Sequence, residues 1–312
     1  MKRMKPLCIA VAAVVVAAHA GRTQQVADTV FVPKTGPAAY APGMGPRIVI
    51  DGGHYNFHTV DGRYRPFAKL AERDGYRVTG SVGGITDESL RNADIFVIAN
   101  PLAQRNDKGR WSLPTPTAYS ASEIAAVRRF VERGGGFLMI ADHMPFGGAI
   151  ENMAASMGIA WINGFAYDAQ DNSIFRYSRA AGFSSHPIFD GRNAGERVDS
   201  VVAFTGSAFW LPSGGAPLFA IPAGSRVRMP TVAWQFTDST ASISATGMLQ
   251  GAALQLGQGR VVAAGEAAMF SAQRSGPKGE GTMGFNAPTA PQNAQFVLNV
   301  LHWLSGLLPA SS

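Results

Sequence analysis

Residues 47–59, which read RIVIDGGHYNFHT, indicate how the rest of the chain is organised. Three β-branched residues follow Arg47, and the run stops at Asp51 and two glycines. A short apolar run bounded by glycine and proline predicts a buried strand that ends abruptly. The loop after it holds His54, Asn56 and His58, so we expect the strand to deliver polar and titratable side chains to a site.

Residues 136–148, which read GFLMIADHMPFGG, have the same form. An apolar strand ends at Asp142 and His143, and Phe146 and Gly147 follow in the next turn. In a parallel sheet of flavodoxin-like order, ligands bind outside the carboxyl ends of the strands where the strand order reverses. We therefore expect the two strand ends to be neighbours and to share one solvent-open crevice. Its expected members are Asp51, His54, Asn56, His58, Asp142 and His143.

The wider pattern predicts the α/β class, with a flavodoxin-like three-layer α/β/α arrangement around a doubly wound, mostly parallel sheet. We expect strands at 47–50, 76–82, 94–100, 137–141 and 159–162, and helices at 63–74, 87–92, after Ser120, and at 149–157. The C-terminal half predicts extra strands at 198–204, 218–221, 232–235 and 261–264, and a last helix at 292–308. A short strand is expected at 29–32, and loops 101–119 and 271–291 are candidate covers of the crevice.

The first twenty residues have the features of a signal peptide. Three basic residues precede an apolar run too short to span a bilayer, and Ala18-His19-Ala20 is a small-x-small cleavage site. We expect an exported protein, periplasmic or extracellular, with no membrane span after cleavage. The expected organisation is a signal peptide at 1–20, an extended segment at 21–46 and one domain at 47–310.

Cleavage changes two inferences about partners and chemistry. The formal charge of +6 would fall to +3, since the prefix holds three basic and no acidic residues. The sequence contains no run of Lys and Arg interleaved with aromatic residues, the pattern that would indicate nucleic-acid binding. Cys8, the only cysteine, would also be lost, so the mature chain would have no thiolate nucleophile or metal ligand.

Three interpretations of the crevice remain open at this stage. In the first, His54, His58, Asp142 and His143 hold a divalent metal, zinc or manganese, that activates water. In the second, His54 or His143 is a general base oriented by Asp51 or Asp142, with Glu266, at the end of another apolar run, as a further acid–base group. In the third, these side chains only hold the loops together. A serine mechanism is not supported, because no G-x-S-x-G occurs.

Ligand contacts are expected from Asn56, Asn100, Phe146 and Gly147. Asn100 ends the apolar strand at 94–100, and Phe146 is one of several aromatic residues predicted to lie on loops. Gly147 and the glycine after it precede a helix and could bind an anion, although they could equally form a flexible turn.

The stretches DGGHYNFHTVDGRYRPFAKLAERDGYRV, IFVIANP, RGGGFLMIADHMPFGG and NAQFVLNVLHWL resemble the class I glutamine amidotransferase-like superfamily. The resemblance is to its bacterial branch related to gliding-motility and intraflagellar-transport proteins and to trehalose-utilisation-like proteins. It covers residues 45–165 and the last helix, and it implies a flavodoxin-like fold. In true amidotransferases the turn after the fourth strand carries the catalytic cysteine. Here Asp142 and His143 take that place, so glutamine hydrolysis through a thioester is not implied.

We therefore expect an exported amidotransferase-like domain without the cysteine nucleophile. The expected activity is hydrolysis of a small polar or carbohydrate-like substrate at a His/Asp site. The alternative is a non-catalytic ligand-binding or assembly module that uses the same crevice.

Overall fold

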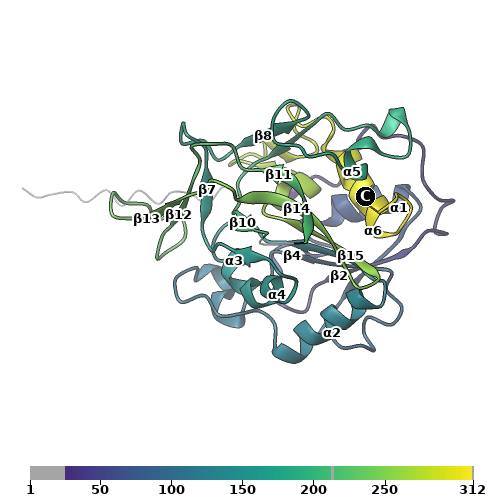
Figure 1. The fold of residues 1–312 in the computed structure, drawn as a ribbon, viewed down its shortest axis with the longest axis horizontal. Coiled ribbons are helices and arrows are strands. Elements are labelled where there is room, and N and C mark those ends of the chain that lie inside the picture. Colours follow the sequence, from purple (N-terminus) through teal and green to yellow (C-terminus); the bar gives the residue numbers. More distant parts are fainter. Residues whose placement is uncertain (1–24, 212–213, 311–312) are drawn as a thin grey trace, which may run out of the picture.

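The computed structural model describes residues 25–211 and 214–310, and its centre is one large mixed sheet (Figure 1). The strand order is β3-β2-β4-β5-β15-β14-β10-β6, and β11 also pairs with β14. The first five strands are mutually parallel, whereas β14 runs antiparallel to β15. In sheet order the strands are β3 (Arg77–Ser81), β2 (Arg47–Asp51), β4 (Ile95–Ala99), β5 (Gly136–Ile140), β15 (Gly259–Ala264), β14 (Leu249–Leu256), β10 (Phe209–Trp210) and β6 (Ala160–Trp161), with β11 at Gly215–Ala220.

The mixed α/β class is confirmed, and one expectation about strand neighbours is wrong. The strands that end at Asp51 and before Asp142 are not adjacent, because β4 lies between them and pairs with both. The order reverses between β2 and β4, where the chain returns across β2 after forming β3. The fifth parallel strand is β15, not the expected strand at 159–162. That segment forms the two-residue β6 at the far edge, antiparallel to β10.

Helices cover both faces of the sheet because successive strand residues point to opposite sides. Ile48 and Val97 pack in one hydrophobic cluster with side chains of α1 (Arg65–Arg73) and α6 (Asn293–Leu304). Phe96 and Phe137 pack in another with α2 (Ala121–Glu132) and α4 (Glu151–Ser156). Figure 1 shows α2, α3 (Phe146–Ala149) and α4 on one side of the central strands, and α1, α5 (Pro187–Asp190) and α6 on the other.

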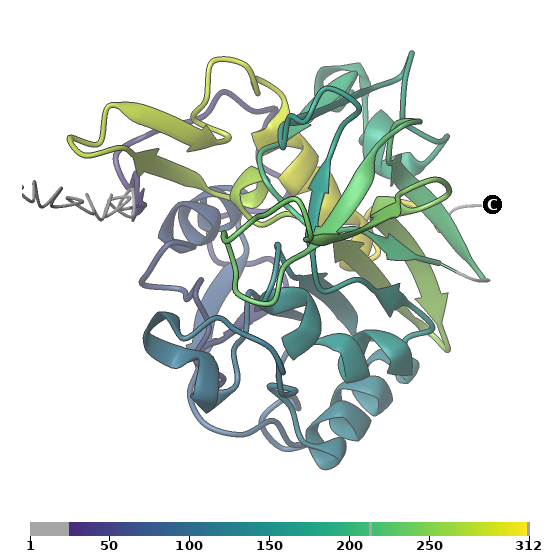
Figure 2. The same ribbon diagram turned by 90° about the vertical axis from the view of Figure 1, so that its left-hand side faces the viewer.

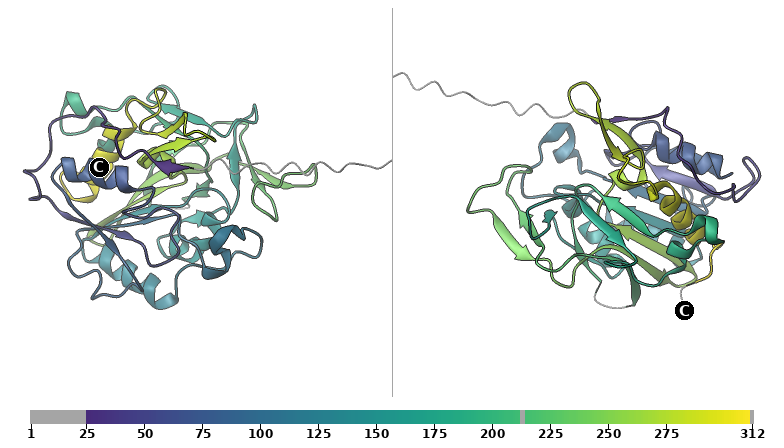
Figure 3. Two further views of the ribbon diagram at one scale, coloured as in Figure 1. Left: turned by 180° about the vertical axis from the view of Figure 1, so that it is seen from behind. Right: turned by 90° about the horizontal axis from the view of Figure 1, so that it is seen from above.

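Small antiparallel sheets extend this body. They are β1 (Val26–Ala27), β16 (Ala272–Ser275) and β17 (Gly281–Gly284); β13 (Ala241–Ser244), β12 (Arg226–Met229) and β7 (Phe165–Tyr167); and β8 (Phe175–Ser178) with β9 (Ser200–Ala203). Three short 3-10 segments are Gln104–Gly109, Ala194–Glu196 and Ala268–Phe270. The β12–β13 hairpin projects from the body as an arm (Figures 1 and 3).

Several local expectations need correction. Residues 87–92 form turns rather than a helix, and the segment 149–157 is divided between α3 and α4 near Ile150. Residues 232–235 form a loop rather than a strand. Residues 29–32 are a turn followed by unpaired chain, and the strand forms earlier, as β1. The segment 271–291 is ordered by the β16–β17 pairing. The capping box of α2 is confirmed, because Ser120 accepts from the N–H of Glu123 and the Glu123 carboxylate accepts from that of Ser120.

The expected signal peptide and Cys8 lie outside the described residues. Within the described part of the chain, no helix is both long and apolar enough to cross a membrane.

Candidate functional site

The expected crevice residues form two separate groups at the carboxyl edge of the sheet. The first group surrounds Asp51 and His54. The Nδ1 atom of His54 lies 2.9 Å from Oδ2 of Asp51, and its Nε2 atom lies 3.0 Å from Oε1 of Glu123. Tyr119 and Asn56 also donate to Asp51, at 2.9 and 3.1 Å.

This first group is a buried, satisfied network. Burial alone lowers the pKa of His54, but the hydrogen bonds and charges of Asp51 and Glu123 outweigh burial and raise it. Burial likewise opposes ionisation of Glu123, yet hydrogen bonds from Ser120, Ile85 and His54 lower the Glu123 pKa to about 2. Both ring nitrogens of His54 are therefore committed to carboxylates. The network ties the loop after β2 to the start of α2.

The second group lies at the ends of β5 and β15. Ala264 pairs with Ile140, and Asp142 and Glu266 each stand two residues beyond that pair. The parallel register therefore sets the two carboxyl groups side by side. Gly206 packs directly against Gly265, the residue before Glu266, because a Cβ on Gly206 would lie 2.1 Å from the Gly265 carbonyl oxygen. This close packing helps to position Glu266.

The two carboxyl groups share a low-dielectric environment. Burial, and then the charge of Glu266, raise the pKa of Asp142 well above its usual 3.8. Burial also raises the pKa of Glu266 to about 7, although backbone N–H groups of Met269 and Ala268 oppose the rise. Two buried carboxyl groups in one site do not both ionise readily. The pair therefore keeps a proton at a pH at which an exposed carboxyl group has lost its own.

Two histidines accompany the pair. Burial lowers the pKa of His143 to about 4, so its ring is neutral at pH 7. Its Nδ1 atom lies 2.7 Å from the carbonyl oxygen of Met144, which can only accept, so Nδ1 carries the proton and Nε2 the lone pair. Burial, followed by the charge of Arg63, lowers the pKa of His58 well below 6.5. Both ring nitrogens of His58 are buried without a hydrogen-bond partner in the described residues.

These groups line one small cavity of about 50 Å³. One buried water needs a cavity of roughly 10–15 Å³ and two to four polar partners. The cavity can therefore hold water but not a substrate of many atoms. Its roof comes from the loop with Trp234, from the β16–β17 hairpin and from the residue before β1. The lining residues are Gln25, Phe57, His58, Asn100, Asp142, His143, Phe146, Thr205, Trp234, Glu266, Ala268, Gln273 and Met283.

Asn100 connects the loops on both sides of the site. Its side-chain oxygen accepts from the N–H of Asp142 at 2.8 Å, and its carbonyl accepts from that of Phe57 at 2.8 Å. Its φ of +49° lies in the left-handed region, which few residues other than glycine adopt and which asparagine tolerates better than most. Gly147 instead has a packing role, since a Cβ there would lie 2.9 Å from the carbonyl oxygen of Ile162.

The structure does not bring the four expected metal ligands together, because His54 belongs to the first group. Across residues 25–211 and 214–310, no three His, Cys, Asp or Glu side chains form a group suited to a metal ion. The four residues therefore do not form a single donor set in the described part of the chain.

Some lining residues were not predicted from the sequence. Trp234 was hidden by the expected strand at 232–235, and Gln273 and Thr205 have no sequence signal of their own. Of the aromatic residues on predicted loops, Phe57 and Phe146 line the cavity, whereas Phe285 is buried beside Phe31.

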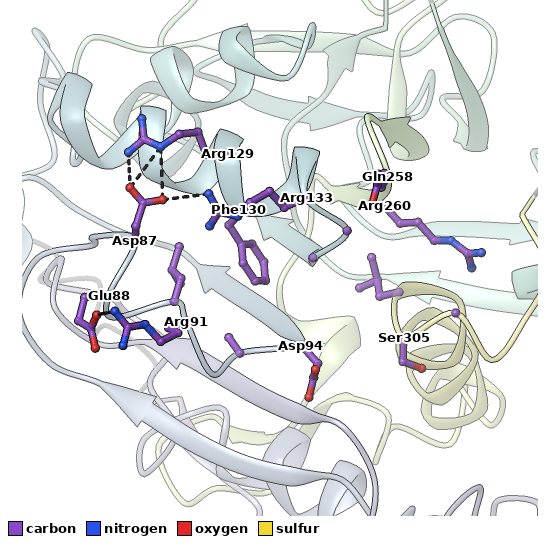
Figure 4. A pocket seen from close by; sticks show the side chains of 16 residues that line it. Asp87, Glu88, Arg91, Asp94, Arg129, Phe130, Arg133, Gln258, Arg260 and Ser305 are labelled. Carbon is purple, nitrogen blue, oxygen red and sulfur yellow. Dashed lines mark hydrogen bonds and ion pairs between the residues drawn. The ribbon is translucent and has the colours of Figure 1, made fainter.

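A larger hollow, of about 1050 Å³, lies elsewhere, at the amino ends of β4, β5 and β15 (Figure 4). Its charges are largely paired: Asp87 binds Arg129 at 2.6 Å and Arg133 at 3.2 Å, and Glu88 binds Arg91. No cluster of perturbed acids opens into it, so we place the functional site at the smaller cavity.

No protein-family model matches the sequence, and no curated protein matches it. Among solved structures, the chain is similar to the mmIFT52 N-terminal domain, with 12% identity and a TM-score of 0.54 over 83% of this chain and 97% of that one. It also matches the cytoplasmic protein STM1381 from Salmonella typhimurium LT2, with 13% identity and a TM-score of 0.49 over 83% and 99% of the two chains. A ThuA-like protein from Bacteroides uniformis matches with 13% identity and a TM-score of 0.44 over 86% and 94%.

At these identities the first likeness concerns the fold alone, and the other two are too weak to support an argument. The fold likeness is consistent with the amidotransferase-like resemblance of the sequence and says nothing about activity.

Proposed function

We propose that this protein is a hydrolase in which Asp142 and Glu266 form the acid–base pair, on a flavodoxin-like three-layer scaffold. The substrate would be small and polar or carbohydrate-like. One observation carries the proposal: two carboxyl groups with raised pKa values face the same water-sized cavity as a histidine without a partner. Burying such groups together costs stability, and perturbed titratable groups gather at functional sites.

The shared proton gives the pair both roles that hydrolysis needs. The ionised carboxylate takes a proton from a water molecule as the water oxygen bonds to the electrophilic carbon. The protonated carboxyl group gives its proton to the leaving oxygen as the bond to that oxygen breaks. An acid or base is most effective when its pKa lies near the working pH, which is the case for a pair that titrates near neutrality.

The histidines would orient the reacting groups. The Nε2 lone pair of His143 accepts a hydrogen bond from water or from a substrate hydroxyl. The neutral ring of His58 supplies one further donor and one acceptor to the same cavity. Both rings stay neutral at pH 7, so they add no positive charge that would hold the carboxyl pair fully ionised.

A second candidate is a non-catalytic ligand-binding or assembly module. Burial of the site favours it, because Glu266 is 1% exposed and Asp142 only 9%. Under this alternative, the pair would hold a ligand through one shared proton and release it unchanged.

Hydrolysis of aryl glycosides and aryl esters by the purified protein distinguishes the two candidates. We expect Asp142→Asn and Glu266→Gln each to abolish turnover, while Glu88→Gln, which removes an exposed carboxylate, leaves it unchanged. Turnover that survives in both site variants would refute the acid–base assignment. Ligand binding without turnover in the wild type would support the alternative.

Export and metal assistance belong to the proposal as separate questions. N-terminal sequencing of the secreted or periplasmic fraction should find a chain that begins near Gly21. Elemental analysis of that fraction for zinc and manganese, with activity measured before and after chelation, tests whether a metal contributes.

A further inference from the structure

The cavity is closed on its outer side by an aromatic residue that is itself half exposed. Trp234 lines the cavity, and 51% of its surface is accessible to solvent. Its ring lies edge-on to His143, with 4.5 Å between centroids, and edge-on to Phe165, with 4.7 Å. Trp234 therefore separates solvent from the ring that presents the Nε2 lone pair.

The backbone at Trp234 is unfavourable for a bulky residue. Its φ is +70°, a left-handed conformation that L side chains rarely adopt outside functional sites. A half-exposed indole and a strained backbone together stabilise the fold little, so packing alone does not account for this arrangement.

The loop around Trp234 is hydrogen-bonded to the body of the fold on one side only, while Phe236 packs its other side against the rings of Phe165 and Tyr167. The carbonyl of Thr231 accepts from the N–H of Leu113 at 2.8 Å, and the N–H of Ala233 donates to Trp111 at 2.8 Å. From Trp234 to Thr240, the hydrogen bonds found in the described chain stay within the loop itself. The loop connects β12 and β13, the arm on the side of the molecule that faces the viewer in Figure 2. Trp234 and the residues after it can therefore move with the loss of ring contacts but of no hydrogen bond to the body of the fold.

We propose that Trp234 is both the removable cover of the cavity and the outer stacking subsite, for the ring of a neutral sugar. This rests on the proposed function, because it assumes that the cavity is where a ligand reacts or binds. In the closed arrangement the cavity of about 50 Å³ admits water only, so the indole must move before a ring can reach Asp142 and Glu266.

The chemistry of the surroundings favours a neutral polyhydroxylated ring. The apolar face of a pyranose can stack on the exposed indole, while its hydroxyl groups donate to His143 Nε2 and to the ionised carboxylate. An anion would meet the negative charge of the pair. A cation would gain little, since the N–H groups of His143, Ala268 and Met269 already bind the carboxyl groups. The guanidinium of Arg63 also lies 3.8 Å from the Phe57 ring that lines the cavity.

Carbethoxylation of histidine by diethyl pyrocarbonate at pH 7, mapped by mass spectrometry, tests both parts without requiring turnover. We expect Trp234→Ala to raise the rate at His143 about 10-fold, because two edge-to-face ring contacts that hold the cover closed are lost. His302, which is fully buried, is the internal control, and Trp210→Ala removes an exposed tryptophan from β10. Cellotetraose and maltotetraose are the probes, and at least one should protect His143 in the wild type and in Trp210→Ala but not in Trp234→Ala.

Each other outcome would overturn the proposal. Equal rates at His143 in the wild type and Trp234→Ala would show that the indole is no cover. Equal protection in both would show that the sugar does not stack on it. Tetramethylammonium is the probe for a cationic ligand. Absence of protection by either sugar, or protection by tetramethylammonium alone, would exclude a neutral sugar as the ligand. Because no arm measures hydrolysis, a failed cover and a failed hydrolase are distinguishable.

Discussion

Replacing Glu266 with glutamine should change how the stability of the protein depends on pH. The folded state raises the Glu266 pKa from 4.5 to about 7, mainly through burial. A carboxyl group with a raised pKa binds its proton more tightly in the folded state than in the unfolded one. The folded state therefore loses stability as the pH rises from about 4.5 through about 7.

The size of the effect follows from the pKa. At about 1.36 kcal/mol for each pKa unit, the rise corresponds to about 3 kcal/mol. Glutamine does not titrate, so this loss is absent from the variant. Glutamine also has one acceptor oxygen where glutamate accepts from Ala268 at 2.7 Å and from Met269 at 2.8 Å. That missing acceptor costs about 1–3 kcal/mol at every pH.

Urea unfolding of both proteins at pH 4 and pH 8 gives the test. The free energy of unfolding of Glu266→Gln minus that of the wild type should be about 3 kcal/mol higher at pH 8 than at pH 4. Glu196→Gln is a control of opposite sign. Burial opposes ionisation of Glu196, but Arg192 outweighs burial and lowers the Glu196 pKa. The free energy of unfolding of this variant should therefore drop further below that of the wild type as the pH rises. A constant difference between Glu266→Gln and wild type at both pH values would refute the buried titrating pair.

Three further predictions concern groups around the site. His54→Gln should cost more stability at pH 5 than at pH 9, because a raised histidine pKa stabilises the fold fully below 6.5 and no longer above its folded pKa; equal costs by urea unfolding would argue against the charged network. Asn100→Gly should lower stability by about 1 kcal/mol, because the N–H of Asp142 loses its acceptor while strain at φ +49° is relieved. Tyr55 has an exposed side chain and a φ of +46°, so Tyr55→Gly relieves backbone strain without removing a buried hydrogen bond and should leave thermal stability unchanged or raised. An equal loss of stability in Asn100→Gly and Tyr55→Gly would contradict this.

Much of the parallel half of the fold was predictable because its strands are apolar and β-branched. The runs at Arg47–Asp51, Ile95–Ala99 and Gly136–Ile140 are strands close to the expected positions, since their periodicity and their glycine boundaries act locally. The order of those strands was not predictable in the same way. It depends on where the chain turns back after β3, which no single run of residues encodes.

The site was predictable as a set of strand ends and not as a set of contacts. Asp142, His143 and Glu266 all follow apolar strands, and the sequence identified each of them as a candidate. It could not show that β15, far along the chain, pairs with β5 and so places Glu266 beside Asp142. It also could not show that Glu123, a helix-capping residue, accepts from the backbone N–H of Ile85 and binds the ring of His54. That contact separates His54 from the other site residues.

Carbon-13 NMR of protein labelled at the Asp and Glu carboxyl carbons measures the titration of the pair directly. We predict that the Glu266 carboxyl titrates near pH 7, that Asp142 titrates well above its usual 3.8, and that Glu266→Gln lowers the Asp142 midpoint by removing the neighbouring charge. Midpoints below about 5 for both groups in the wild type, with no change at Asp142 in Glu266→Gln, would contradict a coupled pair and the acid–base role built on it.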